Sequence, residues 1–116
     1  MSNIQLAVFL DAICLMAAPA SVQMQLGQVS ADEIALEWDN AWHVAKELCE
    51  ERVITAETYN AVTQLNHELG AIEPSSNFWS DEALQFDNRW ENFRIRAQTI
   101  AAQLTAVQLF KLYKNY

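Results

Sequence analysis

The side chains that could carry chemistry are two histidines, two cysteines and a set of carboxylates. A di-iron site in a helical bundle needs a glutamate three residues before each histidine. Asn40 occupies that position before His43, and Gln64 occupies it before the other histidine, His67. His43 and Glu47 lie one helical turn apart, but two ligands do not make a metal site. We therefore expect no bound metal, and histidines that are solvated or hydrogen-bonded locally.

Other catalytic patterns are missing from the sequence as well. Cys14 and Cys49 show no C-x-x-C spacing and fall in apolar segments, so we expect two buried free thiols in a reduced, cytoplasmic setting. Gly27 and Gly70 stand in no phosphate-binding or dinucleotide-binding loop, and no G-x-S-x-G motif occurs. The sequence therefore predicts no catalytic residue, no cofactor and no enzymatic activity.

Composition favours helices as the elements that position these side chains. The 116 residues are 52% hydrophobic and include two Gly and two Pro, so few breakers interrupt an apolar-rich chain. A chain of this length suits one domain with one core, and residues 1–116 are predicted to form a single all-α domain. We expect a bundle of about four helices with a long C-terminal helix.

The first expected helix, over residues 4–18, is apolar on nearly every side. No Lys or Arg precedes it and Asp11 interrupts it, which does not fit a secretory signal. It is also shorter than the roughly 20 residues that span a bilayer. We expect it to be the central buried helix of the bundle and expect no membrane contact. Residues 19–29 should form a loop or one short helical turn.

Capping signals mark the boundaries of the other three helices. Ser30 opens a capping box, and Thr55 can cap the helix that follows. Gly70 stands where a left-handed residue would end that helix. Ser80 repeats the capping pattern and should start an unbroken last helix that continues to about Tyr113, roughly 50 Å long at about 1.5 Å per residue.

Apolar residues recur at helical spacing in two segments. When each residue is turned by roughly 100°, one face of the helix over about residues 31–52 falls in the core: Ile34, Trp38, Ala41, Trp42, Ala45, Leu48 and Cys49. The last helix carries a seam at alternating spacings of four and three: Phe86, Trp90, Phe93, Ala97, Ile100, Leu104 and Val107. Such a seam keeps one partner surface in register over several turns.

The two helices also share a short echo. Residues 35–42 read ALEWDNAW and residues 83–90 read ALQFDNRW, with five of eight positions identical. We interpret the echo as two helices that begin in the same way, with aromatic residues inward and the Asp-Asn pair outward. The alternative is that the two Asp-Asn pairs are paired ligands of something placed between the helices.

Charge is distributed unevenly along the chain, whose net charge is −8. Residues 30–87 hold thirteen carboxylates against Lys46 and Arg52, a net charge of −11, whereas residues 88–116 have a net charge of +4. Neutralisation of phosphates supplies most of the affinity of proteins for nucleic acid. Direct binding to DNA or RNA is therefore not expected of this chain.

On the helix over about residues 31–52, four carboxylates fall on one stripe together with Asn40 and Val44: Glu33, Glu37, Glu47 and Glu51. Like charges one turn apart repel by a few tenths of a kcal/mol, so helix stability does not require the stripe. It is either an ordinary solvated face or a surface for a cationic partner. Phe78 and Trp79 are candidate apolar anchors in the loop before Ser80, although Trp79 could instead pack on the next helix. The candidate partner-binding residues are Glu33, Glu37, Asp39, Asn40, Glu47, Glu51, Phe78 and Trp79.

The acid-rich segment Asp32-Glu33-Ile34-Ala35-Leu36-Glu37-Trp38-Asp39 and the helical pattern after it resemble immunity proteins paired with antibacterial toxins, such as those of contact-dependent inhibition systems. The resemblance covers the general layout of residues 30–110 and assigns no role to a single residue. It implies a cytoplasmic inhibitor that blocks a protein toxin, expected to be a nuclease with a basic active-site cleft. The alternative is a structural or regulatory helical adaptor, phage-encoded or self-associating, whose last helix pairs with a copy of itself as a homodimer.

Overall fold

The chain folds into helices joined by short turns. The computed structural model describes the backbone of residues 3–26 and 30–114, and the side chains of residues 4–25 and 30–104. The helices are α1 (Asn3–Ala17), α2 (Ala20–Gln23), α3 (Ser30–Glu50), α4 (Ala56–Gly70), α5 (Asp81–Phe86) and α6 (Asn88–Lys114), with 3₁₀ turns η1 (Met24–Leu26) and η2 (Asn77–Trp79). No strand occurs in these residues, so the all-α prediction is confirmed, and residues 20–26 are the short helical turn expected there.

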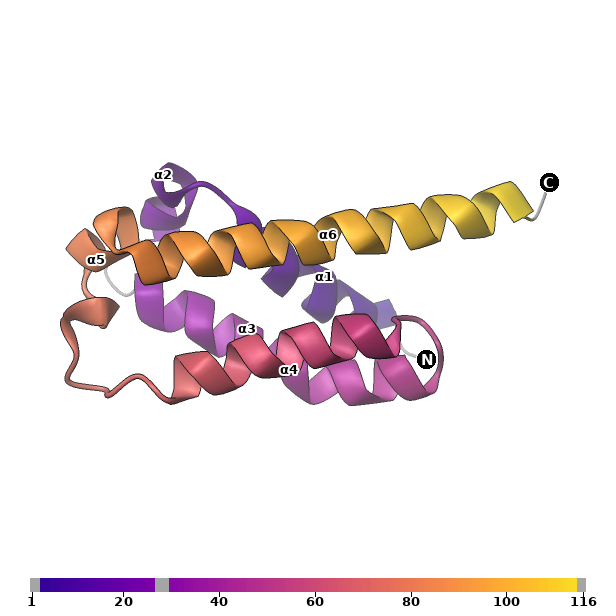
Figure 1. Cartoon of the computed structure of the whole chain (residues 1–116), viewed down its shortest axis with the longest axis horizontal. Helices are drawn as coiled ribbons and strands as arrows, with labels where there is room; N and C mark the ends of the chain where they lie inside the picture. Colours follow the sequence, from indigo (N-terminus) through magenta and orange to yellow (C-terminus); the bar gives the residue numbers. More distant parts are fainter. Residues whose placement is uncertain (1–2, 27–29, 115–116) are drawn as a thin grey trace.

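Four long helices make up the body of the molecule. α3 and α4 run side by side in opposite directions, and α6 lies along the other side of the bundle (Figure 1). α1 packs against both α3 and α6 and so joins the two sides. The last turns of α6 extend past the other helices, which contributes to a longest dimension of 49 Å (Figure 1).

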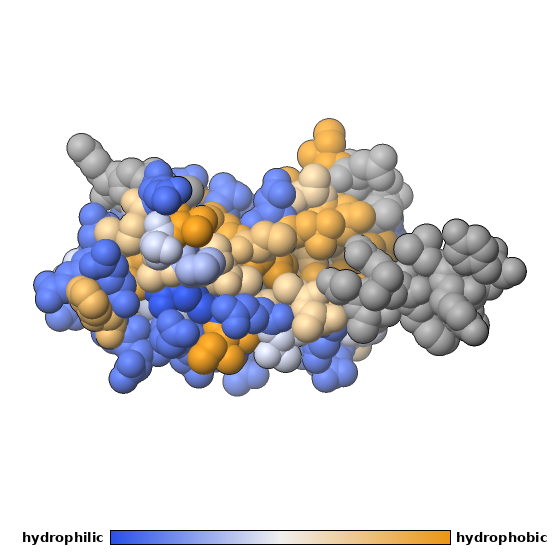
Figure 2. Space-filling model, turned by 90° about the horizontal axis from the view of Figure 1, so that it is seen from above, coloured by the Kyte–Doolittle hydropathy of each residue, from blue (hydrophilic) through white to orange (hydrophobic). Residues whose placement is uncertain are grey.

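α1 is central in position, but only one of its faces is buried. Phe9, Ile13 and Met16 are fully enclosed, at one-turn spacings that fit a helix packed on one side. Ile4, in contrast, is 75% exposed, and Asp11 and other residues of the outer face are exposed too. The prediction of a helix buried nearly all round is therefore wrong for that outer face. Seen from above, the molecule carries a band of apolar residues with hydrophilic residues on both sides (Figure 2).

The predicted core face of α3 is confirmed, with its two edge residues less buried than its centre. Ile34, Trp38, Ala41, Ala45 and Leu48 are fully buried, whereas Trp42 and Cys49 are half-buried against the core. The two indoles point toward α4. Trp38 Nε1 donates to the Val62 carbonyl at 3.2 Å, and Trp42 Nε1 donates to Thr63 Oγ1 at 3.0 Å. The fully buried Trp38 indole and the half-buried Trp42 indole thus each have a partner for the N–H.

Two of the predicted helix starts have the expected cap. Thr55 precedes α4, and its hydroxyl accepts a hydrogen bond from the Thr58 N–H at 3.1 Å. Ser80 precedes α5, and its hydroxyl accepts from the Ala83 N–H at 3.1 Å. α3 begins at Ser30 itself. These starts were predictable because a capping side chain satisfies backbone donors of its own first turn.

The prediction that Gly70 is a left-handed helix end is wrong. Gly70 is the last residue of α4, and the next residue, Ala71, has an ordinary right-handed backbone. The left-handed residue is Arg52, with φ of 63°, at the end of α3. There the Val53 N–H reaches back to the Leu48 carbonyl at 2.8 Å, the bond of a Schellman cap. Glycine permits a left-handed backbone, but the geometry of the chain reversal decides where one is needed.

The predicted unbroken last helix is also wrong, because the chain breaks at Asp87. The backbone of Asp87 is extended, with φ of −76° and ψ of 127°. Its carboxylate accepts from the Arg89 N–H at 2.8 Å and so caps α6. The Leu84 carbonyl, near the end of α5, accepts a hydrogen bond from the guanidinium of Arg94. Two backbone groups at the break, the Arg89 N–H and the Leu84 carbonyl, therefore have side-chain partners.

The break divides the predicted seam of the last helix. Phe86 precedes it and is 76% exposed, which contradicts its predicted place in the core. The rest of the described seam is buried: Trp90, Phe93, Ala97, Ile100 and Leu104. Val107 lies outside the side chains that the structure describes. The register of the seam in α6 was thus predicted correctly, but its first residue belongs to a separate helix.

Arg94 is a buried cation, although the sequence placed it among the charges of the basic C-terminal region. It is 3% exposed, and its Nε donates to Gln23 Oε1 at 2.8 Å. Gln23 is fully buried and donates through Nε2 to the carbonyls of Leu15 and Met16, at 3.0 and 3.1 Å. Glu91 pairs with the outer edge of the guanidinium at 2.9 Å. This network ties α2 and the end of α1 to α6.

Candidate protein-interaction surface

The outward side of α3 carries charge of almost one sign. α3 contains six carboxylates and one cation, Lys46. A turn of roughly 100° per residue separates these carboxylates into two flanks. Glu33, Glu37 and Glu47 lie on one flank and Asp39 lies on the other. The candidate residue Asp39 therefore lies apart from the stripe that contains Glu33, Glu37 and Glu47.

The first flank adjoins α1. Gln5 of α1 donates through Nε2 to Glu47 Oε2 at 2.7 Å. Glu33 and Glu37 are half-buried, whereas Asn40, Glu47 and Glu51 are exposed. Gln5 Oε1 is buried without a hydrogen-bond partner among the described residues. This flank is thus an acidic surface that α1 partly covers.

The second flank faces α4 and centres on Asp39. Its carboxylate accepts from Asn66 Nδ2 at 3.3 Å, and its other oxygen lies 3.5 Å from His43 Nδ1. The same imidazole nitrogen lies 2.7 Å from the Asp39 carbonyl. The Asp39 side chain is 46% exposed, so it is held in place by its neighbours and still open to solvent.

A pocket of about 500 Å³ lies beside Asp39, between α3, α4 and the segment that leads to η2. Its apolar lining comes from Leu36, Leu69, Ile72 and Trp79, and its acidic lining comes from Asp32 and Asp39. Leu36 is 53% exposed although it is a large apolar residue. We refer to this feature as the α3–α4 pocket.

Only part of the lining of the α3–α4 pocket was predicted from the sequence. Asp39 and Trp79 were among the candidate residues, but Asp32 and Leu36 were not. Asp32, Leu36 and Asp39 have spacings of four and three, so they share one side of α3. A leucine on the polar side of a helix, with an acid one turn before it and another one turn after it, was the signal available in the sequence.

Trp79 is held at the pocket by its neighbours in the chain. Ser76 caps the 3₁₀ turn η2, where its hydroxyl accepts from the Phe78 N–H at 3.1 Å. The Trp79 indole donates to the Glu73 carbonyl at 3.0 Å and meets the Trp90 ring edge to face at 6.3 Å. Trp79 is half-buried and lines the α3–α4 pocket.

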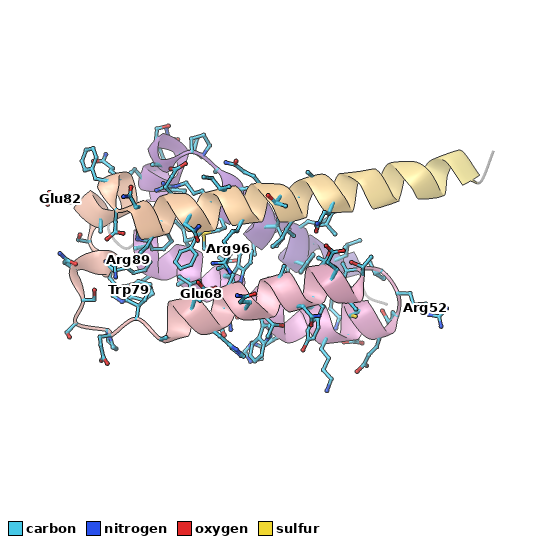
Figure 3. All side chains as sticks on the ribbon, viewed as in Figure 1. Arg52, Glu68, Trp79, Glu82, Arg89 and Arg96 are labelled. Carbon is cyan, nitrogen blue, oxygen red and sulfur yellow. The ribbon has the colours of Figure 1, made fainter. Side chains whose placement is uncertain are left out.

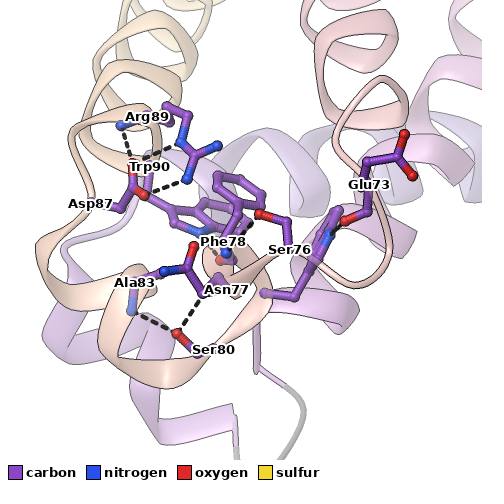
Figure 4. Close-up of polar contacts among 10 residues, drawn as sticks. Glu73, Ser76, Asn77, Phe78, Ser80, Ala83, Asp87, Arg89 and Trp90 are labelled. Carbon is purple, nitrogen blue, oxygen red and sulfur yellow. Dashed lines mark hydrogen bonds and ion pairs between the residues drawn. The ribbon is translucent and has the colours of Figure 1, made fainter.

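Phe78 cannot serve as the exposed anchor that the sequence analysis proposed. It is fully buried and stacks on Trp90, with ring centroids 4.5 Å apart and planes 7° apart (Figure 4). The Arg89 guanidinium carbon lies 4.9 Å from the Phe78 ring centroid. Successive residues of a 3₁₀ turn point about 120° apart, so Phe78 and Trp79 cannot both face outward.

Three arginines of the C-terminal region pair with carboxylates outside α3. Arg89 pairs with Asp87 at 2.7 Å, and Arg94 pairs with Glu91. Arg96 on α6 and Glu68 on α4 point toward each other (Figure 3), with hydrogen bonds of 2.9 and 2.6 Å. These bonds hold the pKa of the Glu68 carboxyl below its ordinary value. These three arginines therefore pair with acids outside α3 and do not neutralise its charge.

The cysteines and histidines form no reactive cluster. Cys14 is exposed and Cys49 is half-buried, so the prediction of two buried thiols is wrong for Cys14. Cys14 lies on the outer face of α1, which was predicted to be buried. Within the described part of the chain, no group of three or more His, Cys, Asp or Glu side chains could hold a metal ion.

Comparisons with known proteins assign no family to this chain. No protein-family profile matches the chain, and neither a curated protein nor a solved structure is significantly similar to it. Among the residues that the structure describes, no helix combines the length and apolar character of a membrane span.

Proposed function

We propose that this protein is an inhibitor of the immunity type, which binds a protein toxin in the cytoplasm through the outward side of α3. The toxin is a protein with a basic surface, for which a nuclease with a cationic active-site cleft is the best fit. The inhibitor acts by occupying that cleft and has no catalytic role of its own.

One observation carries the proposal, namely the single sign of the charge on α3. Six carboxylates stand against Lys46 on this helix, while Arg89, Arg94 and Arg96 pair with acids elsewhere. A field of one sign speeds the encounter with a surface of the opposite sign and discriminates against partners of the same sign. A nuclease cleft has this opposite sign because it binds phosphates.

The proposal is tested on the flank of α3 that adjoins α1. The partner candidate is the product of the neighbouring gene, co-expressed and co-purified with this chain. Combined reversal of two acids, Glu37→Lys with Glu47→Lys, should weaken the complex by about 100-fold or more, because like charges at an interface cost several kcal/mol. Gln5 can still hydrogen-bond the substituting lysine through its oxygen, so the fold should persist.

A matched control changes the net charge equally at another place. Glu57→Lys with Glu82→Lys alters two exposed acids at the starts of α4 and α5. This control should leave the affinity at physiological salt within about threefold of wild type, since rim charges act mainly on the association rate. Equal affinity of the α3 variant and the control would mean that the acidic side of α3 is only a solvated face.

A second candidate function is a self-associating helical adaptor. Two observations favour it: the last turns of α6 extend past the other helices, and the face seen from above carries an apolar band (Figures 1 and 2). Ile95 of α6 is 52% exposed. A homodimer through α6 should persist at high salt and dissociate in Ile95→Asp, as sedimentation would measure, whereas an electrostatic inhibitor complex should associate more slowly as salt rises.

A further inference from the structure

We propose that the α3–α4 pocket binds an arginine side chain from a protein partner, together with an apolar side chain next to it. The inference deepens the proposed function and rests on it for one point, that the arginine belongs to a protein. It names a second contact area on α3, on the opposite flank from Glu37 and Glu47.

The dimensions of the pocket suit one or two side chains. Its volume of about 500 Å³ lies within the range of about 300–1,000 Å³ for sites that bind small molecules. The two carboxylates that line it, Asp32 and Asp39, are seven residues apart, which is about 10 Å along a helix. The apolar residues between and opposite them leave room for the aliphatic part of a long side chain.

The carboxylate of Asp39 is placed to accept hydrogen bonds from a guanidinium. Asn66 Nδ2 donates to one Asp39 oxygen at 3.3 Å and His43 Nδ1 lies 3.5 Å from the other, so the side chain has already lost part of its conformational freedom before binding. A carboxylate has about four lone-pair sites and can accept a bidentate arginine beyond these two contacts. The half-exposed Asp39 side chain leaves those sites open to the pocket.

Leu36 and Trp79 supply the apolar walls. Trp79 is anchored through its Nε1 bond to the Glu73 carbonyl and lines the pocket. A guanidinium is planar and weakly hydrated, so it stacks on an indole better than the ammonium of a lysine does. Leu36 is 53% exposed, and removal of its apolar surface from water by a partner would favour binding. The pocket therefore combines charge and shape for arginine.

The arginines of α6 that adjoin this end of the molecule are engaged elsewhere. Arg89 is held by Asp87 and lies over Phe78, and Arg96 is held by Glu68. Charge complementarity thus points to an arginine from outside the chain. The acidic surroundings of residues 30–87, with a net charge of −11, favour the same occupant.

The probe for the pocket is N-acetyl-arginine methylamide, compared with N-acetyl-citrulline methylamide. Citrulline has nearly the same shape but carries a neutral urea in place of the guanidinium. Titration of the arginine compound into ¹⁵N-labelled protein should shift the Trp79 indole and Leu36 amide resonances until they saturate. The citrulline compound should bind at least about tenfold more weakly. Asp39→Asn should reduce the arginine affinity about tenfold, whereas the matched Glu47→Gln on the other flank should change it less than about twofold.

Three results would overturn the inference. The first is equal binding of arginine and citrulline. The second is unchanged arginine binding in Asp39→Asn, provided that urea unfolding shows the variant to be folded. The third is a partner complex that forms normally with Asp39→Asn and Trp79→Ala combined. None of these results would contradict the proposed function, because the test of that function measures the affinity for the partner in the Glu37 and Glu47 variants.

Discussion

The guanidinium of Arg94 donates through Nε to Gln23 Oε1 over 2.8 Å, although the two residues are 71 positions apart in the chain. Both side chains are buried, and each also reaches backbone carbonyls, Arg94 that of Leu84 and Gln23 those of Leu15 and Met16. A buried cation costs free energy unless all of its donors are engaged. This pair therefore joins the N-terminal helices to α5 and α6 in one arrangement.

Removal of the Arg94 side chain should destabilise the protein strongly. Arg94→Ala leaves Gln23 Oε1 and the Leu84 carbonyl buried without their donor, which should lower the free energy of unfolding by about 3–5 kcal/mol. Arg94→Lys should recover only part of this loss, because an ammonium cannot reproduce the planar fork. Urea unfolding followed by circular dichroism measures both variants.

Arg96→Ala is the matched control for this prediction. Arg96 also bonds a carboxylate, but its side chain is 28% exposed and that of Glu68 is 45% exposed. Solvent screens such a pair, so the loss should be about 1 kcal/mol or less. Similar losses in Arg94→Ala and Arg96→Ala would contradict a special role for the buried network.

Trp90 should contribute through its N–H as well as through its size. Its Nε1 donates to the Phe78 carbonyl at 2.9 Å, and Trp90 is fully buried. Trp90→Phe keeps an aromatic ring against Phe78 but leaves that carbonyl unsatisfied, which should cost about 1–3 kcal/mol. Trp90→Ala should cost about 3–5 kcal/mol. Thermal and urea unfolding would show whether the two losses differ as expected.

Arg52 occupies a left-handed position that suits glycine better, with φ of 63°. Arg52→Gly and Arg52→Ala both remove the side chain, so their difference isolates the backbone. The glycine variant should be more stable than the alanine variant by about 1 kcal/mol, because a Cβ is strained at positive φ. Equal stabilities in urea would argue against a Schellman cap at the end of α3.

Asp87 should stabilise the start of α6 in a pH-dependent way. Hydrogen bonds from Arg89 lower the pKa of the Asp87 carboxyl, so its stabilisation is complete above the unfolded value of about 4 and is lost as the pH falls through the folded pKa. Asp87→Ala should cost about 1 kcal/mol at pH 7 as a lost cap. Asp87→Asn keeps the cap but loses the ion pair, so its loss of unfolding free energy relative to wild type should be smaller. That loss should disappear in acid, where the Asp87 carboxyl of the wild type is protonated. A pH-independent deficit would contradict the ion pair.

The two thiols should differ in reactivity. Cys14 is exposed on α1, whereas Cys49 is half-buried against the core. In the folded protein one thiol should react with Ellman's reagent about tenfold faster than the other, since access limits the reaction. Cys14→Ser should remove the fast phase. Loss of the slow phase instead would place α1 differently in the bundle.

Local signals in the sequence determined several helix starts and much of the core. The caps at Thr55 and Ser80 were predictable because their bonds close within one turn. The buried face of α3 and the seam of α6 from Trp90 to Leu104 followed from helical periodicity, which depends on spacing along one helix. The charge difference between residues 30–87 and 88–116 is likewise a property of the sequence alone.

The tertiary structure decided which of two similar segments stays helical. Residues 35–42 and 83–90 share the pattern Ala-Leu-x-aromatic-Asp-Asn-x-Trp, yet α3 continues through its Asp-Asn pair and the second segment breaks there. Asp39 is held against Asn66 of α4, whereas Asp87 turns to cap α6 and Arg94 takes the Leu84 carbonyl. The Asp87 cap is a local bond, but Asn66 and Arg94 lie outside the two segments, so no pattern within residues 35–42 or 83–90 shows which Asp-Asn pair stays helical. The burial of Arg94 and Phe78, and the meeting of Asp39 with Trp79 at one pocket, depend on the same long-range packing.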